Sequence, residues 1–188
     1  MPDIGITREE ALSLLEESLK NQNLVRHCLA TEAIMRSLAR RFEQDQDLWG
    51  ITGLLHDLDL EIIDNDMNRH ALKTAEILRE RGVSEDVIDP ILRHNEAVGE
   101  PRSSTFEHAL AAAETITGLI VATALVYPDK KLASVKPKSI VKRMKEKHFA
   151  RSASRETIRE CETIGIPLPE FAELSLAAMR EIADDLGL

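Results

Sequence analysis

The sequence contains few cysteines, few aromatic residues and few glycines, and each shortage excludes a class of protein. The two cysteines, Cys28 and Cys161, lie far apart in the 188 residues and form no Cys-x-x-Cys pair. We therefore expect neither a thiolate zinc site nor a fold that depends on a disulfide. Aromatic residues make up 3% of the chain and glycine supplies 8 positions. This disfavours β-sandwiches and barrels, because these need aromatic strands and glycine-rich turns.

Positive charge is also in short supply, since the net charge is −9 at pH 7. A chain this acidic repels a phosphate backbone over most of its surface, so long nucleic acids are not expected partners. The N-terminus shows no basic segment followed by an apolar run, and the uncharged stretch at residues 115–128 is short for a membrane span. These absences predict a soluble cytoplasmic protein without a membrane partner.

Leucine, alanine and charged residues are abundant instead, and nearly every segment repeats its apolar residues with the period of a helix. A capping box at Thr7–Glu10 begins the first predicted helix. The fourth predicted helix ends at Gly82, and the fifth begins after its cap, Ser84, and ends near residue 94. The other predicted helices cover residues 24–42, 48–58, 68–81, a long segment from about 105 that follows a turn at 99–101, 154–164 and 169–186. The pattern predicts an all-α multi-helix bundle with a C-terminal helical extension. Its core spans residues 1–128, and residues 129–188 form a basic segment and C-terminal helices packed on the same core.

Two segments in the second half of the chain have an unusual composition. Between Ala109 and Tyr127 the only charged residue is Glu114, which is typical of a helix buried at the centre of a bundle. Residues 130–155 contain ten Lys or Arg and one acid, a local charge of +9. This basic run is either a solvated helix face, an electropositive rim that guides an anionic substrate, or a patch that docks on the acidic part of a second copy in a homodimer.

Four of the six histidines align with the apolar residues of four successive predicted helices: His27, His56, His70 and His94. Positions three, four or seven apart share a helix face, so these imidazoles are expected to point towards the centre. A hydrogen bond to a carbonyl would explain any one of them. Four together with Asp57 and Glu114 are costly to bury without a shared partner, and a divalent metal ion is such a partner. The other two, His108 and His148, are expected at the surface or at a helix cap.

The order of these residues resembles the HD superfamily of metal-dependent phosphohydrolases, with a histidine, then a His–Asp doublet, then an acid on a later hydrophobic helix. The resemblance rests on four segments: Leu24–His27, Leu54–Leu58, His70–Leu78 and Ala113–Ile120. It implies that one metal ion is held by four residues, His27, His56, Asp57 and Glu114. Asp57 would bridge to a second ion bound by His70 and His94, or a single ion is present and these two histidines contact the substrate phosphate. Iron, manganese, cobalt, nickel and zinc all suit histidine-rich ligation without thiolates.

Two positions depart from the family pattern. The final acid is usually Asp, whereas position 114 is Glu, whose side chain is one methylene longer. Position 59 is an acid where many members have a small residue or glycine. We interpret Asp59 as a solvated loop acid or, in the alternative, as a partner that orients a ligand histidine.

The resemblance implies a phosphohydrolase that cleaves a phosphoester or phosphoanhydride with a metal-activated water, with Asp57 as the catalytic residue and a small phosphorylated compound, expected to be a nucleotide, as substrate. No glycine-rich phosphate loop is present, so Lys73 and Arg93 are the candidates to bind the phosphate, unless they are solvated surface cations. Two other functions stay open. Some HD proteins use the same ligand series as di-iron oxygenases, and a catalytically silent ligand-binding module is the third hypothesis.

Overall fold

The computed structural model describes residues 4–98 and 100–188, and within these ranges the chain forms helices and turns without a β-strand. The prediction of an all-α protein is confirmed. The elements follow the chain in this order: α1 (Arg8–Ser18), α2 (Gln22–Arg41), α3 (Gln46–Leu55), α4 (Leu72–Glu80), α5 (Glu85–His94), α6 (Thr105–Leu125), the 3₁₀ turn η1 (Leu132–Ser134), α7 (Pro137–Arg143), α8 (Arg155–Ile158), α9 (Glu160–Thr163), α10 (Leu168–Glu181) and α11 (Ala183–Leu186). The turn predicted at residues 99–101 begins at Gly99, which lies outside the described residues.

Short polar side chains begin most of the long helices, because they accept hydrogen bonds from backbone N–H groups that a helix leaves unpaired at its start. α1 begins with the predicted capping box, in which Thr7 and Glu10 each accept a hydrogen bond from the other's backbone N–H. A second capping box, Ser104 with Glu107, begins α6. Single caps begin α2, α3 and α5: Asn21, Asp45 and Ser84.

Four predicted helices differ from the structure. The helix predicted over 68–81 begins only at Leu72, because Ala71 has a φ of 70°, outside the helical range. The helix predicted over 48–58 ends at Leu55, after which the chain continues in turns. The helices predicted over 154–164 and 169–186 are each divided, the first at Arg159 and the second at Ile182.

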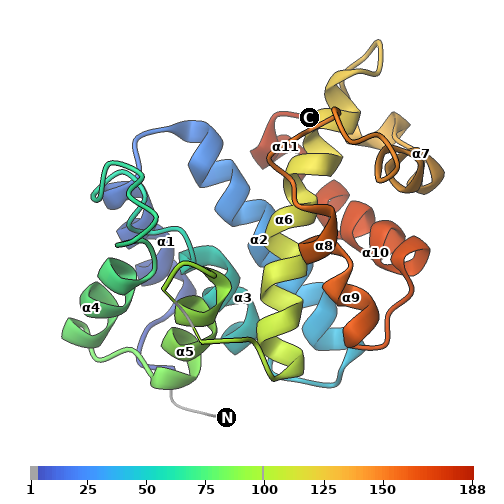
Figure 1. Cartoon of the computed structure of the whole chain (residues 1–188). Coiled ribbons are helices and arrows are strands. Elements are labelled where there is room, and N and C mark those ends of the chain that lie inside the picture. The colour runs from blue at the N-terminus through green and yellow to red at the C-terminus, as the bar shows by residue number, and fades with distance from the viewer. Residues whose placement is uncertain (1–3, 99) are drawn as a thin grey trace.

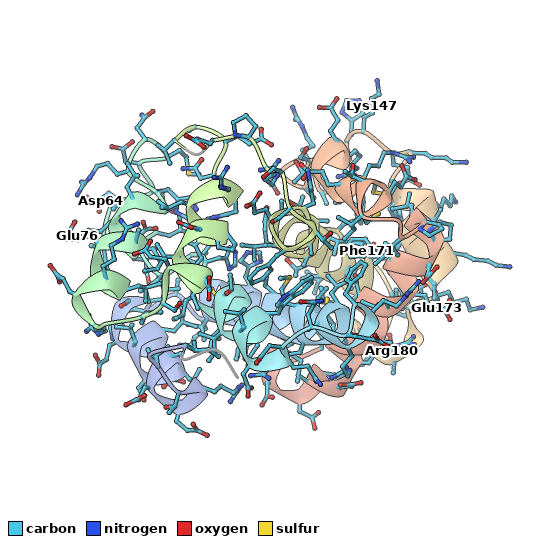
Figure 2. The ribbon with its side chains drawn as sticks, turned by 90° about the horizontal axis from the view of Figure 1, so that it is seen from below. Asp64, Glu76, Lys147, Phe171, Glu173 and Arg180 are labelled. Atoms are coloured by element: carbon cyan, nitrogen blue, oxygen red, sulfur yellow. The ribbon has the colours of Figure 1, made fainter. Side chains whose placement is uncertain are left out.

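α2 and α6 run through the middle of the molecule, and the other helices pack on either side of them (Figure 1). On one side, α1, α3, α4 and α5 share an apolar core with the first half of α2. On the other side, the C-terminal helices share a core with α2 and α6, in which Phe171 of α10 is fully buried (Figure 2). The boundary between the two cores is where the candidate site lies.

α6 is the most apolar helix, and its length and composition alone would allow it to cross a membrane. Within the structure, however, 67% of its most apolar window is buried inside the bundle. Packing in the core therefore accounts for its composition, as expected for a central helix that is apolar on most sides. Its half-buried polar residue, Glu114, faces a cavity described below.

α3 lies close against α2, and Gly53 makes this approach possible. A Cβ atom at Gly53 would lie 3.0 Å from Cγ of Met35 and 3.1 Å from the carbonyl oxygen of Thr31, so any larger residue would push the helices apart. The close packing brings the C-terminal end of α3 next to the first turns of α2. His56 and His27 are neighbours as a result.

Glu107 gives α6 a charged cap whose contribution depends on pH. Burial alone would raise the pKa of its carboxyl, but the backbone N–H groups of Ser103 and Ser104 and the charge of Arg93 outweigh burial, so the pKa lies below its ordinary value of 4.5. The carboxylate therefore stabilises the fold above about pH 4.5, and this stabilisation is lost as the pH falls through the lowered pKa.

We predict that Glu107→Gln lowers the free energy of unfolding by about 1 kcal/mol at pH 7. The difference from the wild type should shrink towards acid pH, where the wild-type carboxyl is protonated as well. Urea denaturation at a series of pH values measures this. Glu173→Gln, on the exposed face of α10 (Figure 2), is the control and should match the wild type throughout. A loss that is the same at every pH would contradict the prediction.

Candidate metal centre

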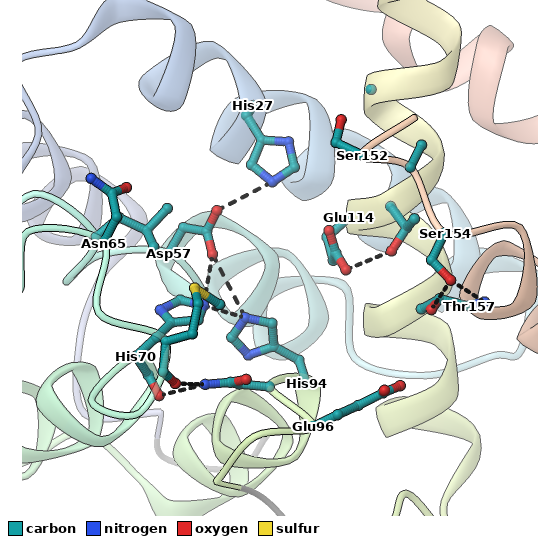
Figure 3. A pocket seen from close by; sticks show the side chains of 16 residues that line it. His27, Asp57, Asn65, His70, His94, Glu96, Glu114, Ser152, Ser154 and Thr157 are labelled. Carbon is teal, nitrogen blue, oxygen red and sulfur yellow. Dashed lines mark hydrogen bonds and ion pairs between the residues drawn. The ribbon is translucent and has the colours of Figure 1, made fainter. Parts of the chain in front are cut away.

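Four histidines and one aspartate come together at the boundary between the two cores. His27 lies on α2, His56 caps the end of α3 and Asp57 follows it, His70 lies in the turn before α4, and His94 is the last residue of α5. Figure 3 shows His27, His70 and His94 arranged around the Asp57 carboxylate. The structure thus brings together five of the six residues expected to be ligands. His70 reaches the centre from a turn, however, and not from the helix predicted for it.

The ring nitrogens lie close to the carboxylate and to one another. Nε2 of His27 is 3.3 Å from Oδ2 of Asp57, and Nε2 of His56, His70 and His94 are 3.4, 3.3 and 3.6 Å from Oδ1. The Nε2 atoms also pair, at 3.1 Å between His27 and His56 and at 3.0 Å between His70 and His94. The donor atoms therefore form two groups that share Asp57.

His56 and His94 are oriented by the ends of their own helices. The last carbonyl groups of a helix have no partner within it, and a side-chain donor can satisfy them. Nδ1 of His56 donates to the carbonyl of Gly53, and Nδ1 of His94 donates to the carbonyl of Ile91, in both cases three residues earlier. The same local geometry at two helix ends therefore directs both Nε2 atoms towards Asp57.

His27 and His70 are oriented by partners from other parts of the chain. The hydroxyl of Thr117 donates its hydrogen to the carbonyl of Glu114, so it accepts a hydrogen bond from Nδ1 of His27 at 2.8 Å. Nδ1 of His70 donates to Oδ1 of Asp59 at 2.7 Å. In all four rings the proton on Nδ1 points outward, which leaves the lone pair of Nε2 facing the centre.

This arrangement fits a metal centre. Two Nε2 lone pairs that face each other at 3.0–3.1 Å repel unless a positive charge lies between them. Neutral imidazoles and an ionised carboxylate are ordinary ligands of divalent transition metals, and the two donor groups could hold one ion or two. Neither Cys28 nor Cys161 belongs to these donor groups in the described part of the chain, and burial raises the pKa of the Cys161 thiol to about 12.

Protons can supply the positive charge before a metal binds. Burial disfavours a charged His70, but Asp57 and Asp59 outweigh burial and raise its pKa to about 9. The pKa of His27 is also raised, since Asp57 outweighs the effect of burial there. Burial lowers the pKa of His56 to about 3, so this ring stays neutral. Burial opposes the charge of Asp57 too, but the surrounding histidines hold its pKa well below the ordinary value.

Asp59 is fully buried, so its interpretation as a solvated loop acid is wrong and the alternative is correct. Its Oδ1 orients His70, and its Oδ2 accepts a hydrogen bond from the backbone N–H of Thr74 at 3.0 Å. α4 has no side-chain cap at Ala71, and Asp59 provides one from the preceding turn. One carboxylate therefore fixes both the start of α4 and the ring of a candidate ligand.

Glu114 is the one predicted ligand that the structure does not place with the other five. Its carboxylate belongs to neither group of donor atoms, and Oε1 accepts a hydrogen bond from the hydroxyl of Thr115 at 2.6 Å. Figure 3 shows Glu114 apart from the histidines, on the wall opposite Asp57. Burial raises the pKa of its carboxyl.

A cavity of about 580 Å³ opens beside the metal-binding residues. Its far wall includes three hydroxyl groups that the sequence analysis missed: Ser152, Ser154 and Thr157. Arg155 holds this wall in place, because its guanidinium donates to backbone carbonyls of the preceding loop, including those of Ala150 and Ala153. In the sequence Arg155 is one of many residues in a basic run, and nothing there distinguishes it from its solvated neighbours.

The two predicted phosphate-binding residues do not line this cavity. Lys73 pairs with Glu76 at 2.6 Å, and Arg93 donates to the carbonyl of Pro101 and lies 3.4 Å from Glu107. The lysines of the basic run are exposed and also lie outside the cavity lining, which favours the solvated-face interpretation: Lys130, Lys131, Lys136, Lys138, Lys142, Lys145 and Lys147. His148 is exposed as expected, whereas His108 is half-buried and bonds to Glu160.

Comparison with known proteins gives one match. The family model described as HD domain matches residues 24–160. This range contains the five clustered residues and Glu114, and it extends past residue 128, the predicted end of the core, to include the hydroxyl wall. Neither the curated proteins nor the solved structures gave a match.

We predict that metal binding releases protons at pH 7. His70 has a pKa of about 9 and must lose its Nε2 proton to bind an ion. Calorimetric titration of chelator-treated protein with Mn²⁺, in buffers of different ionisation enthalpy, measures the number released. Because His148 is exposed and outside the cluster, His148→Ala should release as many protons as the wild type, and His70→Ala should release fewer. Heats that do not depend on the buffer would contradict this prediction.

We also predict that Asp59→Asn weakens metal binding about 10- to 100-fold, the usual effect of removing the partner of a ligand histidine. An amide cannot accept hydrogen bonds at both oxygen positions, so either His70 or the Thr74 N–H loses its acceptor. Competition with a chelator measures the affinity. Asp64→Asn is the matched control, since Asp64 is exposed and Asn tolerates its φ of 53°. Equal affinities of the two variants would show that Asp59 has no such role.

Proposed function

Because the chain belongs to the HD domain family, whose members are mostly metal-dependent hydrolases, we propose that it hydrolyses a phosphoester with the help of one or two divalent metal ions. The observation that supports this most strongly is the convergence of four Nε2 atoms on one buried, ionised carboxylate. His27, His56 and Asp57 would hold one ion, and His70 and His94 would hold a second through the shared Asp57.

Divalent ions in such a centre increase the acidity of bound water at neutral pH and offset the negative charge on phosphoryl oxygens. The protein keeps the ligands ready for this task. Every ring is oriented by its Nδ1 hydrogen bond, and Asp57 stays ionised although it is only 8% exposed. Ligands already in position reduce the reorganisation that binding requires.

We propose that Glu114 exchanges a proton with the substrate. Its Oε1 accepts from Thr115, so Oε2 is the atom that can hold or release a proton inside the cavity. The raised pKa of this carboxyl favours the protonated form that a leaving oxygen requires. In this proposal Glu114 acts on the substrate, while the five clustered residues act on the metal.

The cavity lining favours a substrate with a single phosphate. No lysine or arginine occurs among its lining residues in the described part of the chain. A triphosphate confined to this cavity would find no cationic side chain among its lining residues to offset its additional charges. Within the nucleotide class, a nucleoside monophosphate is therefore the proposed substrate, and about 580 Å³ is within the range of pockets that bind molecules of this size.

The proposal predicts multiple turnovers by protein loaded with Mn²⁺, Fe²⁺, Co²⁺, Ni²⁺ or Zn²⁺. Released phosphate would be measured with nucleoside mono-, di- and triphosphates and simple phosphomonoesters. Asp57→Asn should lose metal and reduce kcat/KM about a thousandfold or more, since it removes the shared ligand. Glu114→Gln should keep the metal content of the wild type and lose kcat.

Three results would contradict parts of this proposal. Bound metal without turnover on any phosphoester would favour the silent ligand-binding module. Oxygen consumption that depends on iron, without phosphate release, would favour the di-iron oxygenase. Loss of metal in Glu114→Gln would restore this residue to the ligand set.

A further inference from the structure

A second cavity, of about 500 Å³, adjoins the metal cavity along the surface of α6. It is lined by residues from the start of α2, from the second half of α6 and from the end of the chain at Leu186–Leu188. The two cavities share two lining residues, His27 and Gly118. The metal centre therefore has a neighbouring space on the far side of His27 that the proposed chemistry does not use.

One face of α6 lines both cavities. Residues three, four or seven apart lie on the same side of a helix, and Glu114, Gly118, Val121 and Leu125 follow this spacing. Glu114 faces the metal cavity, Gly118 belongs to both, and Val121 and Leu125 belong to the second. The face changes from polar to apolar as it leaves the metal centre.

Gly118 lies at the junction, and no packing contact requires glycine there. A Cβ atom at this position would meet no atom of a neighbouring residue within 4 Å, and the residue is exposed although it lies in the middle of the central helix. Glycine is a poor helix former, so alanine would favour the helix more. What glycine provides here is open space between the two cavities.

The walls of the second cavity suit an uncharged group. Most of its lining side chains are apolar, namely Ala30, Val121, Ala122, Leu125, Leu186 and Leu188. Leu125 is 50% exposed, so apolar surface is available for a ligand to cover. On its α2 side the polar lining residues are His27 and two exposed residues, Asn23 and Arg26.

We propose that the second cavity binds the uncharged organic part of the substrate, with its phosphate held at the metal centre and its chain passing Gly118. This inference rests on the proposed phosphoester hydrolysis, and it adds a substrate class: phosphomonoesters with an apolar group several atoms long. A nucleobase and an alkyl chain share the required chemistry, and the experiment below separates them.

The test measures the binding of alkylphosphonates, which are not hydrolysed, to metal-loaded protein. Affinity for the series from methyl- to octylphosphonate should rise about fourfold for each methylene that enters the cavity, the effect expected of burying one such group. In parallel, adenosine 5′-monophosphate and ribose 5-phosphate are compared as inhibitors. If the cavity binds a nucleobase, adenosine 5′-monophosphate should bind more tightly than ribose 5-phosphate. If it binds an alkyl chain, these two compounds should bind equally and the affinity should rise along the phosphonate series.

Three variants localise the effect. Gly118→Leu should flatten the dependence on chain length, because its side chain fills the junction, and Gly118→Ala should have a smaller effect. Leu125→Ser should reduce the dependence because it removes apolar wall. Val126→Ser is the matched control, since Val126 is the next residue, is 55% exposed and does not line this cavity. Circular dichroism should show the wild-type helix content in all of them.

An affinity that does not depend on chain length or on the nucleobase would overturn the inference, as would a dependence that Gly118→Leu and Leu125→Ser leave unchanged. These results are distinguishable from a failure of the proposed function. If the metal-loaded protein hydrolyses no phosphoester but still binds longer phosphonates more tightly, the proposed subsite is supported and the proposed reaction is contradicted. If it hydrolyses phosphoesters equally well whatever the length of their organic group, the proposed reaction is supported and the proposed subsite is contradicted.

Discussion

The structure depends on one electrostatic constraint: the Asp57 carboxylate is ionised inside the protein with four imidazoles around it. Removing a carboxylate from water is costly unless nearby positive charge compensates for it. Here the compensation comes from protons on His27 and His70 or from metal ions in their place. The surrounding helices therefore have to deliver ring nitrogens to one point, and their ends and contacts follow from that requirement.

Helix ends meet this requirement with ordinary capping interactions. His56 caps α3 and His94 is the last residue of α5, and each donates to a carbonyl three residues earlier, so the same hydrogen bond ends the helix and directs a candidate ligand. The Asp59 carboxylate likewise has two roles at the start of α4, since it caps the helix and orients His70. Since these interactions have two roles each, a substitution at one of them affects local stability and metal affinity together.

The sequence allowed the fold and the convergence of the histidines to be predicted, because both follow from periodicity. His27, His56 and His94 lie on helices whose apolar faces define the core, and inward-facing imidazoles are then a geometric consequence. His70 reached the centre for a different reason from the one expected. The positive φ of Ala71 delays the helix, and no signal in the sequence indicates a positive φ at an alanine.

The remaining differences come from tertiary contacts that a sequence pattern cannot specify. The position of the Glu114 carboxylate, which accepts a hydrogen bond from the Thr115 hydroxyl, is one example. The hydroxyl wall depends on Arg155, whose guanidinium binds loop carbonyls instead of solvent or substrate. Arg93 was expected at the phosphate because it is next to His94, but adjacent helical residues point in different directions. Lys73 was expected there because it lies one turn after His70, but His70 lies in the turn before α4, so the two residues share no helix face.

The burial of α6 also determines where its site residues can lie. A helix that is packed in a core on most of its surface can expose only a narrow face, and on α6 that face lines both cavities. Thr117 lies on the edge of this face and orients His27 through Nδ1, so the helix that forms the substrate walls also aligns a metal ligand. A ligand that contacts the face between Glu114 and Leu125 would therefore lie against the same helix that holds His27 in place. In the proposed complex, the organic group and the alignment of His27 would both depend on the position of α6.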